Sequence, residues 1–277
     1  MRPNRLSFVK DPSVADWIAP RLGPFGGWVG SVVPRGFPAY TRILHPVRDR
    51  DGESATWAAV CAQTQREAHA LMQWQSIGSP RVEDGSGRPA SGGVPWEGDE
   101  PAVGELEPQA LAALCRLLAA HTDPALECFF ALWEGWGWIP GGRSVAVLRA
   151  PGLTELQGSP GTAEPPVSAV PPAFGGEVIS GGRLHHPGRD YLLFAGPPDA
   201  AMDLGHWPSR DWFVPQSPSL IWPTDHSWCV ATEVDFDSTL IAGHTALIDA
   251  VLGAQDLEAT PVEPWDCLDI RADMVNV

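Results

Sequence analysis

Residues Ser217 to Gly253 read SPSLIWPTDHSWCVATEVDFDSTLIAGHTALIDAVLG, and they contain the clearest strand, turn and helix patterns of the chain. Two runs rich in apolar and β-branched residues, 219–222 and 228–235, flank the segment PTDHS. Proline and aspartate in such a segment favour a tight turn. The stretch therefore predicts a β-hairpin.

The segment after this hairpin carries a helical pattern. Asp237 or Ser238 is placed to cap a helix, apolar residues follow at helical spacing, and Gly253 closes it. We expect this helix over 239–252.

The second strand of the hairpin predicts one core face and one face that becomes acidic. Alternation puts Trp228 and Val230 on the first face, and Glu233, Asp235 and Asp237 on the second. Side chains two residues apart on a strand lie roughly 7 Å apart, which is close enough for three carboxylates to hold Mg²⁺ or Ca²⁺ with further loop oxygens.

Other interpretations of these carboxylates remain open. In a chain with 34 acidic residues, a solvated edge followed by a helix cap is the favoured one. The carboxylates could also divide acid and base roles if burial separated their pKa values. His226 beside Asp225 offers a base with an orienting acid, and His244 lies nearby in the chain, but the chain contains no G-x-S-x-G nucleophile motif.

Three more helices are expected along the chain. A capping pattern at Ser13 and Asp16 predicts a short helix over 13–19, and helical spacing after Ser54 predicts one over 55–70. Pro108 and the leucine stripe that follows predict a strong helix over 108–121.

The remaining strands are expected at 39–45, 126–133, 143–150 and 191–195. The second and third of these are predicted to pair as a hairpin around a turn that holds Trp136 and Trp138. Exposed rings at such a tip would form a partner surface, whereas rings folded back over the sheet, the favoured alternative, would be part of the scaffold.

Two stretches rich in proline and glycine, at about 78–104 and 151–182, predict long loop insertions in one domain spanning 1–277. Hairpins and helices without regular strand-helix alternation favour an α+β fold, with a mainly antiparallel sheet of about five or six strands and helices packed on it.

Composition narrows the classes of partner. The formal charge is −16, with Lys10 as the single lysine, which argues against nucleic acid or an anionic membrane surface. The five cysteines are odd in number and lack any C-x-x-C pair, which is typical of a reducing compartment. Without an apolar signal segment or an apolar run of 18 residues, we expect a cytoplasmic protein.

Three blocks of the chain resemble recurring blocks in a family of high-GC actinobacterial proteins without an established activity. They are HT-x-P-x-x-x-C-x-F-x-LW-x-G-x-G from His121 to Gly137, YLLFAGP from Tyr191 to Pro197, and the segment from Ser217 to Gly243. The resemblance implies origin and an intact domain rather than a function.

Thirteen tryptophans, the acidic charge and the lack of catalytic motifs predict a noncatalytic, adaptor- or immunity-like protein that binds a protein partner and needs no cofactor. The residues expected to bind are Trp136, Trp138, Asp225 and His226. The alternative is a metal-assisted hydrolase that uses Glu233, Asp235 and Asp237 with Mg²⁺ or Ca²⁺.

Overall fold

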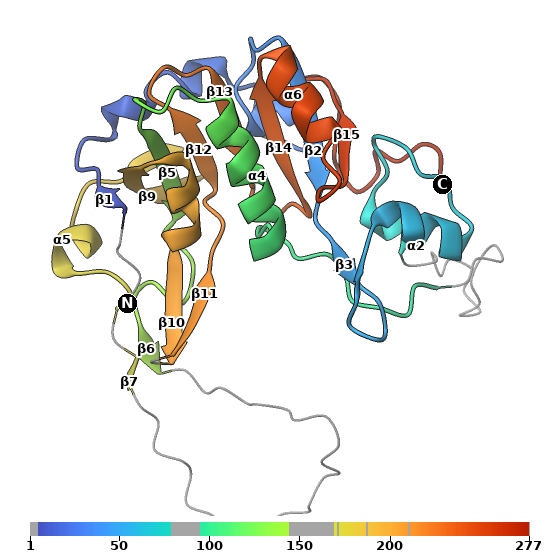
Figure 1. The fold of residues 1–277 in the computed structure, drawn as a ribbon, viewed down its shortest axis with the longest axis horizontal. Helices are drawn as coiled ribbons and strands as arrows, with labels where there is room; N and C mark the ends of the chain where they lie inside the picture. Colours follow the sequence, from blue (N-terminus) through green and yellow to red (C-terminus); the bar gives the residue numbers. More distant parts are fainter. Residues whose placement is uncertain are drawn as a thin grey trace, which may run out of the picture.

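The computed structural model describes residues 5–78, 95–143, 169–170, 172–186, 188–209 and 211–276. An antiparallel sheet of nine strands lies at its centre (Figure 1). The strands are β1 (Ser7–Phe8), β2 (Ala39–Leu44), β5 (Cys128–Trp133), β8 (Leu184–His186), β9 (Arg189–Gly196), β12 (Leu220–Pro223), β13 (Trp228–Ala231), β14 (Ser238–Gly243) and β15 (Ala259–Pro261).

Eight strands follow the order β1-β9-β5-β12-β13-β14-β2-β15, and β8 also pairs with β9. The α+β class with an antiparallel sheet is thus confirmed. The sheet exceeds the expected five or six strands because β1, β8 and β15, of two or three residues each, join six longer strands. Such short strands carry almost no pattern of their own in a sequence.

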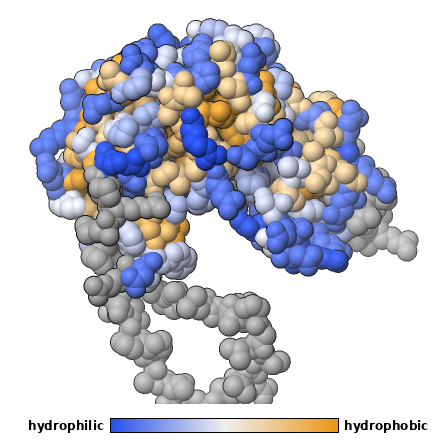
Figure 2. Space-filling model, viewed as in Figure 1, coloured by the Kyte–Doolittle hydropathy of each residue, from blue (hydrophilic) through white to orange (hydrophobic). Residues whose placement is uncertain are grey.

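One face of the sheet is covered by α4 (Pro108–Ala120), α6 (Thr245–Leu252) and the 3-10 segment η3 (Pro198–Asp203). Leu114 of α4, Ile248 of α6 and Phe130 of the sheet belong to one cluster of buried residues there. The helix predicted over 108–121 is confirmed, and its leucine stripe faces this core. Figure 2, in the same view, shows hydrophobic patches among hydrophilic residues over α4 and α6.

The opposite face is covered by short, irregular elements. They are η1 (Pro12–Ala15), η2 (Ala19–Arg21), α1 (Val29–Val32) and the chain after β15. The helix expected over 13–19 is therefore wrong: the Asp11 carboxylate accepts from the Ser13 amide and caps a 3-10 turn instead. Pro20, which has no N–H, prevents a longer helix.

A third cluster of buried residues lies beside the sheet, around Trp57 and Trp74. It holds α2 (Trp57–Thr64), α3 (Trp74–Ile77) and the paired strands β3 (Val47–Arg48) and β4 (Ser54–Ala55). The helix expected over 55–70 is shorter, because Gln65 adopts a left-handed φ of 60° and ends it. Thr56 rather than Ser54 is its cap.

The hairpin of β12 and β13 is confirmed, but the segment after it differs from the expectation. β13 ends at Ala231, and 238–243 forms the strand β14, which pairs with β13 on one edge and β2 on the other. The helix starts only at Thr245, with His244 as its cap. Local spacing cannot separate a strand buried on both faces from the first turns of a buried helix.

The hairpin expected between 126–133 and 143–150 is also wrong. Both edges of β5 are occupied, by β9 and β12. β6 (Gly142–Arg143) pairs instead with β7 (Ala169–Val170), and residues 144–150 lie outside the described residues.

Two elements remain. β10 (Gly205–Ser209) and β11 (Trp212–Pro215) form a two-stranded ribbon that projects from the sheet (Figure 1). The short helix α5 (Gly176–Ile179) lies in the second expected insertion, where Phe174 and Val178 pack against the main core.

Most of both insertions lies outside the described residues, and a single domain over 1–277 stays a prediction. No helix in the described ranges is long and apolar enough to cross a bilayer.

Candidate functional site

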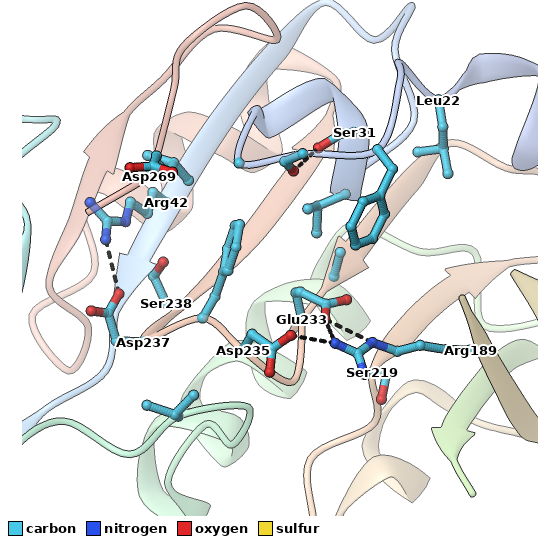
Figure 3. A pocket seen from close by; sticks show the side chains of 18 of the residues that line it. Leu22, Ser31, Arg42, Arg189, Ser219, Glu233, Asp235, Asp237, Ser238 and Asp269 are labelled. Atoms are coloured by element: carbon cyan, nitrogen blue, oxygen red, sulfur yellow. Dashed lines mark hydrogen bonds and ion pairs between the residues drawn. The ribbon is translucent and has the colours of Figure 1, made fainter. Parts of the chain in front are cut away.

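A pocket of about 400 Å³ lies on the irregularly covered face of the sheet (Figure 3). Its floor includes Tyr191, Leu220 and Ala231, which belong to the core on that side. Its walls come from 22–27 in the N-terminal segment and from 268–270 near the C-terminus. A partly apolar cavity of this size with a few polar groups is typical of a ligand site.

Arg189 holds two carboxylates at one end of the pocket. One of its terminal nitrogens lies 2.7 Å from a Glu233 oxygen and 2.5 Å from an Asp235 oxygen. The guanidinium also lies over the Trp133 ring, 5.3 Å from its centroid. Burial disfavours the Arg189 charge, but the two carboxylates outweigh this effect and raise its pKa. Arg189 is therefore a fixed cation.

Arg42 occupies the other end and is almost fully buried. It donates from Nη2 to Asp237 Oδ1 at 3.1 Å and from Nη1 to the Met72 carbonyl at 2.9 Å. Burial lowers the pKa of Arg42 and raises that of Asp237, because each charge has lost water. The two charges persist there only because each has the other as a partner.

Two buried polar atoms of residues that line the pocket have no hydrogen-bond partner in the described part of the chain: Arg42 Nε and Ser238 Oγ. Both residues are 1% exposed. A buried unpaired polar group costs about 1–3 kcal/mol and is uncommon in folded proteins. The pocket thus has hydrogen-bonding capacity that these residues leave unused.

Two paired segments that contribute to the pocket lining carry exposed apolar side chains. Segments 25–28 and 265–270 lie together, since Trp28 and Cys267 form a β-bridge and the Leu268 amide donates to the Gly27 carbonyl at 2.6 Å. We call these two segments the roof. Four roof side chains are exposed: Phe25 (81%), Trp28 (49%), Trp265 (70%) and Ile270 (57%).

The described lining residues carry an excess of negative charge. Four carboxylates, those of Glu233, Asp235, Asp237 and Asp269, face two guanidinium groups, which leaves a formal charge of −2. His186 also lines the pocket, and burial lowers its pKa and favours its neutral form.

The three carboxylates expected on one strand face do meet in this pocket, but by another route. β13 has ended before Glu233, and the Phe236 amide donates to the Glu233 carbonyl in a turn. Arg189 binds two of the carboxylates and Arg42 the third. In the ranges that the structure describes, no group of three or more His, Cys, Asp or Glu side chains is placed to hold a metal ion.

The two histidines expected to assist those carboxylates have other contacts. The His226 ring stacks on Trp17, with centroids 4.4 Å apart and an interplanar angle of 16°. Burial and the nearby Arg21 lower its pKa. His244 Nδ1 accepts from the Leu247 amide and caps α6.

Asp225 does not orient His226. Its carboxylate accepts from the Ser227 amide at 3.0 Å and so stabilises the turn between β12 and β13. Neither Asp225 nor His226 lines the pocket.

Trp136 and Trp138 pack against the main core rather than standing at a tip. Trp136 meets Trp133 edge to face, with centroids 5.6 Å apart, and Trp138 stacks on His206 at 5.1 Å. Both rings are half-buried. The exposed tryptophans are Trp28, Trp265 and the ribbon residues Trp207 and Trp212.

Sequence reasoning missed Arg42 and Arg189, the two cations that organise the pocket. A signal was present for each: Arg42 interrupts the apolar strand expected at 39–45, and Arg189 lies two residues before the start of the strand expected at 191–195. A charge inside a buried strand needs a partner, but the partner is distant in the chain.

Comparisons with known proteins add no relative: no family model matches the chain, and neither the curated proteins nor the solved structures contain a significant match.

Proposed function

We propose that this chain is a noncatalytic binding protein of the cytoplasm, of actinobacterial kinship, that engages a partner protein through the roof and the acidic pocket beneath it. The observation that carries the proposal is the exposure of four apolar side chains on the two paired roof segments: Phe25 and Ile270, which line the pocket, and Trp28 and Trp265 in the same segments. Exposed apolar groups gathered on one surface are typical of interaction sites, and tryptophan is enriched among residues that dominate interface energies.

The charged groups of the pocket also favour binding over catalysis. Glu233 and Asp235 share Arg189, and Asp237 is held by Arg42. A carboxylate that already neutralises a guanidinium is a weak general base, and no nucleophile with an adjacent base lies among the described lining residues.

The alternative of a metal-assisted hydrolase draws on the meeting of Glu233, Asp235, Asp237 and His186 in one pocket. A divalent cation would have to displace Arg189 from two carboxylates. Thermal unfolding with Mg²⁺, Mn²⁺ or Ca²⁺ tests this alternative. A stabilisation that Asp235→Ala removes would support it.

Affinity purification from native cytoplasm, followed by calorimetry with the purified partner, tests the proposed function. We expect Phe25→Ser combined with Trp265→Ser to weaken binding at least about tenfold, as loss of interface anchors does. Trp207→Ser combined with Trp212→Ser, on the ribbon, is the matched control for loss of exposed aromatic area. Equal binding by wild type and the roof variant would contradict the proposal.

A further inference from the structure

The chemistry of the pocket selects among partner segments, an inference that rests on the proposed function. The pocket is unfavourable for binding an anion, because Arg42 and Arg189 both already contact carboxylates. An incoming anion would have to replace those carboxylates in a pocket whose lining carries a formal charge of −2.

A cation, in contrast, finds carboxylates that are not fully neutralised. Asp235 shares one guanidinium with Glu233 and keeps a side chain that is 75% exposed. Asp269 is exposed and makes no ion pair within the described residues; one of its oxygens accepts from the Arg271 amide at 3.0 Å. The chain as a whole carries a formal charge of −16, so its long-range electrostatic field also attracts cations.

The pocket interior suits a long aliphatic stem. Leu220, Ala231 and Phe236 supply apolar lining to the pocket, whose volume is about 400 Å³. Lysine and arginine side chains bury their methylene stems against apolar surface while their charged heads stay near water or acidic groups.

The unpaired polar atoms indicate that more than a free cation is accommodated. The Ser238 hydroxyl and Arg42 Nε can both donate hydrogen bonds, and each is buried without a partner in the described residues. An extended peptide offers the matching acceptors in its backbone carbonyl groups.

We propose that the pocket receives a lysine or arginine side chain from an exposed segment of the partner protein, with its charged head toward Asp235 at the Arg189 end. Asp269, which lies beside Arg42 in Figure 3, adds negative charge at the other end. Apolar residues that flank it in the segment pack on Phe25, Trp265 and Ile270 of the roof.

Selection of a random seven-residue peptide library displayed on phage against the intact protein tests this proposal. We expect the enriched peptides to carry lysine or arginine next to apolar residues. Synthetic versions, measured by calorimetry, should bind roughly 2- to 5-fold more weakly for each of Asp235→Asn and Asp269→Asn, as for exposed ion pairs. Raised salt should reduce this difference.

Asp256→Asn is the matched control, because it removes one exposed carboxylate from another surface and changes the net charge equally. Thermal unfolding of each variant verifies that it is folded. Peptides that bind the roof but are neutral or acidic, or basic peptides that lose equal affinity with Asp256→Asn, would overturn the inference and leave the proposed function standing.

Two other outcomes are informative. If no enriched peptide depends on Phe25 and Trp265, both proposals fail. If the pocket binds a free amine such as spermidine as tightly as any basic peptide, with the same loss at Asp235→Asn, the segment proposal is overturned in favour of a small cationic ligand.

Discussion

Asp237→Asn tests how much the pocket relies on its buried ion pair. The substitution removes the negative charge that faces Arg42, which is 1% exposed. It leaves neutral partners, which are the amide oxygen of the new side chain, the Met72 carbonyl at 2.9 Å and the Trp57 ring, whose centroid lies 5.3 Å from the guanidinium carbon. Removing one partner of a buried pair costs about 3–5 kcal/mol. The Asp237 side chain is 18% exposed, so water offsets part of this cost and we expect about 2–4 kcal/mol.

This loss is large enough to measure. For a chain of 277 residues, about 3 kcal/mol corresponds to a decrease in Tm of roughly 5 °C. Calorimetry and urea denaturation at pH 7 would measure it. Arg42→Met combined with Asp237→Leu should recover most of the loss, because an apolar pair of similar volume removes both desolvation penalties.

Asp256→Asn again is the control, because its partner Arg116 and Asp256 itself are 66% and 70% exposed. It should change the free energy of unfolding by less than about 0.5 kcal/mol. An Asp237→Asn variant as stable as wild type, or a double variant no better than the single one, would refute this account of the pair.

Two further predictions concern stability. Burial lowers the pKa of His45 to about 4, below the usual 6.5 of a histidine, so the unfolded chain takes up a proton first as the pH falls. The free energy of unfolding should decrease by about 3 kcal/mol between pH 6.5 and pH 4, and His45→Gln should reduce this dependence in urea titrations. Gly104 has a φ of +73°, and a Cβ there would lie 2.6 Å from the Val234 carbonyl oxygen, whereas Gly36, with a φ of +99°, has open space. We therefore expect Gly104→Ala to lower Tm clearly more than Gly36→Ala; equal effects would mean that the contact with Val234 contributes nothing.

Gly104 also bears on the site. Its amide donates to the Phe236 carbonyl at 2.8 Å, so it supports the turn that places Glu233 and Asp235 against Arg189. The position of this turn, which contributes Glu233 and Asp235 to the pocket, thus depends on Gly104, which does not itself line the pocket.

Elements with local signals were predictable from the sequence alone. The hairpin of β12 and β13 follows from two apolar runs around a turn, and α4 follows from Pro108 and a leucine stripe. Strand alternation also predicted that the acidic residues after β13 lie on the same side of the sheet as Cys229 and Ala231. The alternation continues for a few residues beyond the end of the strand.

The contacts of those carboxylates, in contrast, depend on how distant parts of the chain come together. β14 became a strand because β13 and β2 occupy its two edges, and β2 lies nearly 200 positions away in the chain. The same long-range pairing carries Arg42 to Asp237, and the loop geometry after β13 carries Glu233 and Asp235 to Arg189. Periodicity records which way a side chain points from its own backbone, whereas ion pairs between distant segments depend on how the sheet is assembled. The acidic stretch was therefore visible in the sequence, whereas the pairing of its carboxylates with Arg42 and Arg189 was not.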